Sequence, residues 1–99
     1  MKADHIFMVA VDVTDPTIDL DGMRKIVKTS PRIHAWWNHI PGCFLIVTDT
    51  DPDQLTDEFR QATRDARLLV MEVKPSISEG WLPEQSWNWI RQRETESTH

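Results

Sequence analysis

Residues 6–13 read IFMVAVDV, a stretch in which apolar side chains occupy both sets of alternating positions. A strand with that pattern needs apolar cover on both faces of its sheet. Asp12 is its one charged residue, and Thr14-Asp15-Pro16 then turns the chain away. The sequence therefore predicts a central strand with a carboxylate at its end, and Asp12 is the leading candidate for a site residue.

Composition narrows the class of protein. The 99 residues, 39% hydrophobic and 27% charged, suffice for one globular domain. No apolar run approaches the ~20 residues of a membrane span, and the first residues lack the pattern of a signal peptide. A single cysteine cannot form an internal disulfide. From these three observations together we expect a cytoplasmic protein without membrane contact. The net charge of −5 argues against a general nucleic-acid binder but leaves a local basic patch open.

After this strand, the sequence predicts a helix and then a hairpin. Apolar residues recur at helical spacing over 20–29, Asp19 or Asp21 can cap the start of this helix, and Ser30-Pro31 ends the pattern. The tryptophan-rich segment 32–40 alternates poorly, which is typical of a short edge strand. Pro41-Gly42 predicts a type II turn, in which glycine takes a positive φ, and leads into a strand over 43–47.

A second helix and a last strand complete the predicted core. The helix begins at Asp51-Pro52, where an N-cap acid precedes a proline, and its apolar face runs from Leu55 to Ala66. Residues 67–73 then form a strand. The order βαββαβ is that of the α+β ferredoxin-like sandwich, in which two helices cover one face of a four-stranded antiparallel sheet with strands one and three central. We expect a single domain spanning 1–99, with this core over about residues 5–74.

The end of the chain predicts an extra helical segment outside that core. It covers 79–92, with a helix over 84–91 in which Trp87 and Ile90 share one face. Residues 93–99 are polar, and we expect them to fray.

The predicted strands carry more apolar residues than two helices can cover. Residues 6–13, 43–47 and 67–73 are apolar on both faces, and an uncovered sheet face would exceed the few hundred Å² of apolar patch usual for a soluble monomer. The cover is the tryptophan-bearing C-terminal segment, a second copy of the chain, or the C-terminal segment of one copy lying across another. Because closed twofold assemblies dominate among soluble oligomers, we expect a homodimer.

Several features together resemble the small SinR-annotated proteins. They are a first strand ending in Val11-Asp12, the pair Trp36-Trp37 closely followed by a histidine, the run Leu68-Leu69-Val70, and Gly80-Trp81-Leu82 before a tryptophan-bearing helix. The resemblance covers about residues 6–92. That group is in turn similar to the VapD toxins and to the small CRISPR-associated subunit of the spacer-acquisition complex.

The resemblance implies a ferredoxin-like protomer that dimerises through its sheet or sheet edge. In the CRISPR-associated relatives, the acid that ends the first strand faces its twin across the dimer and was proposed to hold a divalent metal for phosphodiester cleavage. Asp12 takes that position in this chain, whereas Val11 stands where those relatives commonly have a tyrosine.

The candidate site residues each have a structural alternative. Asp12 from two copies, aided by Asp15, would suit Mg²⁺, which proteins hold with one or two carboxylates plus waters and substrate phosphates. Alternatively, both acids only cap the turn and the first helix. His34 and His39 would lie on opposite faces of a regular strand, so we expect structural histidines rather than a general base. Cys43 lies in a central strand and is expected to be buried and unreactive.

The five tryptophans and one basic cluster leave a binding role open. Aromatic platforms for single-stranded nucleic acid have basic residues between the rings, and these tryptophans have few, so we expect core and subunit-contact positions. The basic cluster, which comprises Arg24, Lys25, Lys28 and Arg32, suits an anionic ligand or a solvated helix face. The sequence holds no zinc-ligand spacing and no glycine-rich phosphate loop, so it predicts no cofactor.

These observations lead to two hypotheses from different classes. The leading one is a small cytoplasmic homodimer that acts as a non-catalytic interaction or accessory protein. The alternative is a divalent-metal-dependent nuclease, with Mg²⁺ held by Asp12 of both subunits. A regulatory domain for a small ligand is a third possibility, by analogy of fold.

Overall fold

The computed structural model describes residues 4–74 and 78–97. Its elements follow in the order β1 (His5–Val11), α1 (Leu20–Thr29), β2 (Ile33–Ile40), β3 (Cys43–Thr48), α2 (Pro52–Thr63), β4 (Leu68–Glu72) and α3 (Glu84–Ser97). All pairings are antiparallel, and the strands lie in the order β2-β3-β1-β4. This arrangement confirms the predicted ferredoxin-like α+β fold, with β1 and β3 at the centre of the sheet.

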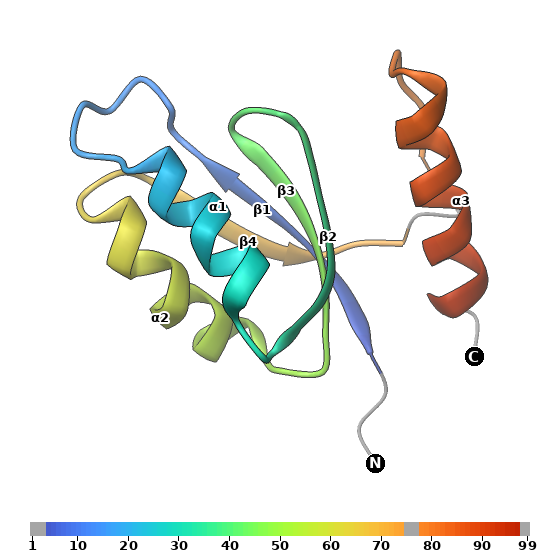
Figure 1. Cartoon of the computed structure of the whole chain (residues 1–99), viewed down its shortest axis with the longest axis horizontal. Helices are drawn as coiled ribbons and strands as arrows, with labels where there is room; N and C mark the ends of the chain where they lie inside the picture. The colour runs from blue at the N-terminus through green and yellow to red at the C-terminus, as the bar shows by residue number, and fades with distance from the viewer. Residues whose placement is uncertain (1–3, 75–77, 98–99) are drawn as a thin grey trace.

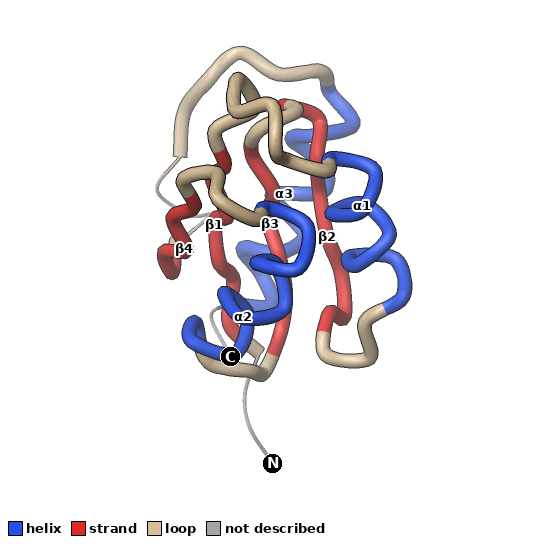
Figure 2. The backbone as a smooth tube through the Cα atoms, turned by 90° about the vertical axis from the view of Figure 1, so that its left-hand side faces the viewer, coloured by secondary structure: helices blue, strands red, loops and turns tan. Residues whose placement is uncertain are grey.

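The sheet separates two unequal layers of helix. Helices α1 and α2 lie together on one face, and α3 lies on the other (Figure 1). The view from the side shows the same order, with α1 and α2 in front of the strands and α3 behind them (Figure 2). The chain therefore covers one face of the sheet with two helices and the other face with a single helix.

The main core fills the space between the sheet and the helix pair. Val9 of β1 lies opposite Phe44 of β3 and Val70 of β4, so these three side chains share one face. Met23 from α1 and Phe59 from α2 pack with Val9 and Phe44 in the same buried cluster. This face of the sheet therefore buries one of the two alternating sets of apolar side chains in the strands.

Both helices of that layer begin at the acids that the sequence indicates. The Asp19 carboxylate accepts a hydrogen bond from the Gly22 amide (2.9 Å), and the Asp51 carboxylate accepts one from the Gln54 amide (2.8 Å). These bonds satisfy amides that have no partner within the helix. Helix α2 ends before the predicted Ala66, because Arg64 takes a positive φ of 55°.

The turn between β2 and β3 differs from the predicted type II turn. Gly42 is not among the residues with a positive φ. A close approach of the backbone requires glycine here instead, since a Cβ at this position would lie 2.8 Å from the Val11 carbonyl oxygen. The Val11 amide donates to the Gly42 carbonyl at 2.8 Å, which holds the hairpin turn against the end of β1.

Helix α3 is longer than the predicted helix over 84–91. It continues to Ser97 because residues 91–94, Arg-Gln-Arg-Glu, are good helix formers, and the rest of the expected frayed tail, 98–99, lies outside the described residues. Among residues 84–92 of this helix, Ser86 and Ile90 are buried. The predicted C-terminal segment is thus one source of cover for the second face of the sheet.

Candidate functional site

Asp12 and Asp15, the predicted metal ligands, lie in the loop that leads from β1 to α1. The Asp12 Oδ1 atom accepts hydrogen bonds from the Thr14 amide (2.9 Å) and hydroxyl (2.5 Å). Asp15 Oδ1 does the same with the Thr17 amide (2.8 Å) and hydroxyl (2.7 Å). The loop is therefore built from two consecutive Asp-x-Thr turns, in which each acid binds the threonine two residues later.

These hydrogen bonds favour the charged form of both carboxylates. The pKa of Asp12 is lowered by the Thr14 hydroxyl first, then by the Thr14 amide, with a smaller contribution from the positive charge of Arg67. The Thr17 hydroxyl and amide likewise lower the pKa of Asp15, against a small opposing effect of the Asp12 charge. Both acids are thus ionised at neutral pH and already serve as acceptors within their own loop.

The residues of a single chain do not build a metal site at this loop. Within residues 4–74 and 78–97, no group of three or more His, Cys, Asp or Glu side chains is placed to hold a metal ion. Asp12 and Asp15 supply two carboxylates, and each uses one oxygen for two hydrogen bonds. The nuclease alternative, which needs Asp12 from two subunits, stays a prediction.

The two predicted structural histidines have different partners. His34 Nδ1 is 2.8 Å from the carboxylate of Asp4. His39 Nδ1 is hydrogen-bonded to the hydroxyl of Ser86 on α3, and its ring lies 5.3 Å from the Trp37 ring, centroid to centroid. Neither histidine meets Asp12, so the structure does not bring a general base to the predicted site.

Cys43 lies at the start of β3, opposite Ala10 of β1. It is half-buried, and burial raises the pKa of its thiol above the usual value. A thiol that stays protonated at neutral pH is a poor nucleophile. This environment does not activate Cys43 as a nucleophile.

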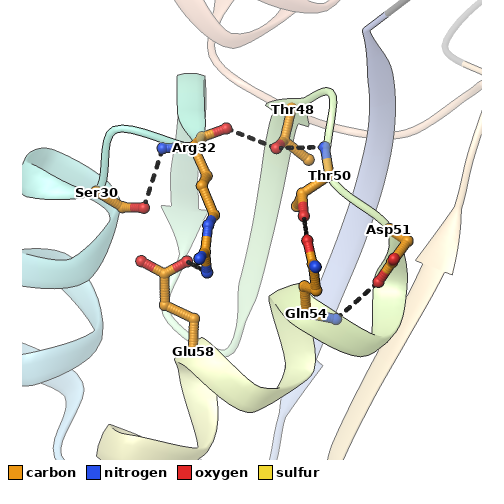
Figure 3. A network of polar contacts seen from close by, with 7 residues as sticks. All are labelled: Ser30, Arg32, Thr48, Thr50, Asp51, Gln54 and Glu58. Atoms are coloured by element: carbon orange, nitrogen blue, oxygen red, sulfur yellow. Dashed lines mark hydrogen bonds and ion pairs between the residues drawn. The ribbon is translucent and has the colours of Figure 1, made fainter. Parts of the chain in front are cut away.

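A network of polar contacts fixes the end of the sheet where α2 begins (Figure 3). The Thr48 hydroxyl donates to the Arg32 carbonyl (2.5 Å) and accepts from the Thr50 amide (3.1 Å). The Thr50 hydroxyl then bonds to the Gln54 side chain, while the Gln54 amide is held by Asp51. The residue that precedes β2 and the first turn of α2 are thereby tied to the end of β3.

A cavity of about 520 Å³ lies beside this network, between α2 and the sheet. Phe7 and Val70 give it apolar walls, and His5 and Glu72 line its polar part. His5 Nδ1 is 2.5 Å from the Glu72 carboxylate, and Asp51, which also lines the cavity, caps α2. The polar residues that line this cavity therefore stabilise the fold, and we assign the cavity no ligand.

The second face of the sheet, which we call the open face, is only partly covered by α3. Val47 and Trp37 are buried there, whereas Leu69 and Met71 of β4 are each 50% exposed. Ala10 lies opposite Leu69 and Met8 lies opposite Met71, which places all four side chains on the same face. An apolar strip on β4, which consists of Leu69 and Met71, is therefore left bare.

The tryptophans, which the sequence predicts at core and subunit-contact positions, differ in their burial. Trp37 is buried, and Trp36, Trp87 and Trp89 are half-buried. Trp81, however, is 99% exposed, so this residue is not part of the core, and a subunit contact there stays a prediction. It lies just before α3.

Comparison of the chain with protein-family models, with curated proteins and with solved structures found no match. The ferredoxin-like class therefore stands on the strand order, and the functional argument rests on the residues themselves. The repeated Asp-x-Thr pattern at 12–14 and 15–17 is the sequence signal that would have shown how both acids are used. No helix among the described residues is long and apolar enough to cross a membrane.

Proposed function

We propose that this chain is a non-catalytic interaction protein that works as a homodimer in the cytoplasm. The observation that carries the proposal is the bare apolar strip on β4, formed by Leu69 and Met71. Exposed apolar side chains side by side on an edge strand mark a surface that pairs with another chain. The occupant we propose is a second copy, with β4 of each protomer antiparallel to the other across a twofold axis.

The two edges of the sheet differ in a way that supports pairing through β4. Strand β2 shows register shifts between Ile33 and Ala35 and between Trp37 and Ile40, and such irregularities protect an edge from added strands. Strand β4 pairs with β1 without a shift over Leu68–Glu72. The regular edge is thus the one that also carries exposed apolar side chains.

The backbone amides of β4 also support pairing through this edge. Strand β4 is bonded to β1 through the Arg67 carbonyl (3.1 Å) and the Val73 amide (2.9 Å) at its two ends. Because amides along a strand point alternately to opposite sides, the outward amides of β4 belong to Leu68, Val70 and Glu72. A second β4 would accept hydrogen bonds from these donors.

The open face beside β4 has to contribute to such a dimer. A standard interface removes about 800 Å² from each partner, more than two short strands bury by edge pairing alone. Met8 and Leu45, which are half-buried and lie opposite one another, extend the apolar surface from the β4 strip toward the centre of the sheet. The proposed interface therefore joins the β4 edge to the part of the open face that α3 leaves bare.

Light scattering with sedimentation velocity tests this proposal. The wild-type chain should have twice its monomer mass of 11.6 kDa at micromolar concentration. Leu69→Lys places a charge in the strip and should yield the monomer, since a charged side chain blocks edge pairing. Val13→Lys is the matched control, because Val13 is 43% exposed but lies outside the strip, and it should stay dimeric. A monomeric wild-type chain, or a dimeric Leu69→Lys variant, would contradict the proposal.

A further inference from the structure

A second cavity, of about 420 Å³, lies at the β2 edge of the sheet, between α1 and α3. Three of the five tryptophans line it, namely Trp36, Trp37 and Trp89. Trp36 and Trp37 point to opposite faces of β2, because they lie opposite consecutive residues of β3. The cavity therefore extends around the sheet edge, with indole rings on both sides of the strand.

The charge of this cavity is opposite to that of the whole chain. Arg24 and Lys28 of α1 line it, one helical turn apart, and no carboxylate is among the described side chains that line it. Arg24 contacts Asp21 at 3.3 Å in an exposed pair, which is a weak interaction. Lys28 has no ion pair within the described part of the chain. In a chain with 16 acidic and 11 basic residues, a cavity whose described lining holds two cations and no acid favours an anionic ligand.

Polar groups that can read a planar ligand complete the lining. Gln85 contributes a side-chain amide, and Asn38 offers its amide oxygen, since its nitrogen donates to the Ile40 and Cys43 carbonyls (2.9 Å each). His39 is held in place by its hydrogen bond to Ser86. Trp37 is 4% exposed and its indole nitrogen is buried, so Trp36 and Trp89, which are half-buried, are the rings that a ligand can reach.

We propose that this cavity binds a nucleoside monophosphate, with the base against the indole rings and the phosphate between Arg24 and Lys28. Stacking on tryptophan favours a flat heterocycle, and paired cations favour a phosphate. The volume lies within the range of small-molecule sites, about 300 to 1,000 Å³. The irregular pairing of β2 makes this edge a poor template for a peptide strand, which favours a small ligand.

Calorimetry and tryptophan fluorescence on the full chain test the proposal with separate parts of the ligand. Adenosine 5′-monophosphate should quench the fluorescence and bind at least about tenfold more tightly than adenosine, which lacks the phosphate. Inorganic phosphate, which lacks the base, should also bind at least about tenfold more weakly. Equal affinity for adenosine, or for inorganic phosphate, would overturn the proposal, as would no binding of the nucleotide at millimolar concentration.

Variants locate the site. Lys28→Gln should weaken nucleotide binding about tenfold, and Trp89→Leu by a similar factor. Lys25→Gln and Trp81→Leu are the matched controls, because both residues are exposed and neither lines the cavity, and they should bind as the wild type does. An equal loss in Lys25→Gln and Lys28→Gln would overturn the proposal. A single-stranded oligonucleotide bound more than about a hundredfold more tightly than the mononucleotide would also overturn it, in favour of a nucleic-acid surface.

Discussion

His39 of β2 is hydrogen-bonded through Nδ1 to the hydroxyl of Ser86 on α3, and this contact joins the last helix to the open face of the sheet. Ser86 is fully buried, and Ile90, one turn further along, is buried on the same side. The rest of α3 rests on few contacts with β1 and β2. The position of α3 therefore depends on a small number of side chains. The cover of part of the open face and the cavity between α1 and α3 depend on the same side chains.

Ser86→Ala tests this dependence. Loss of the hydroxyl should lower the free energy of unfolding by about 1 kcal/mol, because water can replace the lost partner of the exposed His39. Backbone amides of α3 should exchange faster in this variant, while those of α2 keep the wild-type rate. Asn88→Ala, an exposed change on the same helix, is the control and should stay within about 0.5 kcal/mol of wild type. Unchanged exchange of α3 in Ser86→Ala would show that the contact does not position the helix.

Phe59→Ala tests the core between the sheet and the helix pair. Phe59 is fully buried, and its ring centroid lies 6.1 Å from that of Phe44. Its truncation should lower the free energy of unfolding by about 3 to 5 kcal/mol, through lost burial and a residual cavity. Urea denaturation measures the loss, and Arg60→Ala on the exposed side of α2 is the control. A loss below about 1 kcal/mol would place Phe59 outside a packed core.

The two Asp-x-Thr turns predict a dependence of stability on acid. Because the folded-state pKa of Asp12 lies below its usual 3.8, its contribution to stability is complete above pH 3.8 and is lost as pH falls through the lower, folded value. Asp12→Asn should therefore lose less of its free energy of unfolding between pH 7 and pH 3 than the wild type does. Unfolding curves at pH 7, 4 and 3 measure this difference. Thr14→Val should raise the pKa of Asp12 toward 3.8 in an NMR titration, since the hydrogen bond from the Thr14 hydroxyl is the main cause of the lowered pKa. An Asp12 pKa that is unchanged by Thr14→Val would contradict the assignment.

The sequence predicts the core of this fold well because local signals and hydrophobic pattern agree there. The strand that ends at Val11, the acid caps at Asp19 and Asp51, and the order of the elements all lie where short-range chemistry places them. The turn at Gly42 was predicted wrongly, because proline and glycine together indicate a positive φ, whereas a tertiary contact with Val11 decides the need for glycine. The identities of Pro41 and Gly42 do not report a contact with a strand that is distant in the sequence.

The site was harder to predict than the fold. Asp12 was placed correctly at the end of a central strand, but its bonds to Thr14 depend on a side-chain conformation that hydrophobic patterning does not report. Arg24 and Trp89 lie far apart in the sequence, and they line one cavity only because α3 returns to the β2 edge. Trp36 and Trp37, taken with their direct sequence neighbours Ala35 and Asn38 alone, lack the basic residues that α1 brings to the cavity.

The most direct test of the proposed dimer is hydrogen exchange, followed by NMR, at the outward amides of β4, which belong to Leu68, Val70 and Glu72. Pairing of two β4 strands predicts that these amides are protected at high protein concentration and exchange more freely on dilution. In Leu69→Lys they should exchange freely at every concentration. Free exchange of all three amides in the concentrated wild-type protein would contradict edge pairing through β4 and, with it, the proposed assembly.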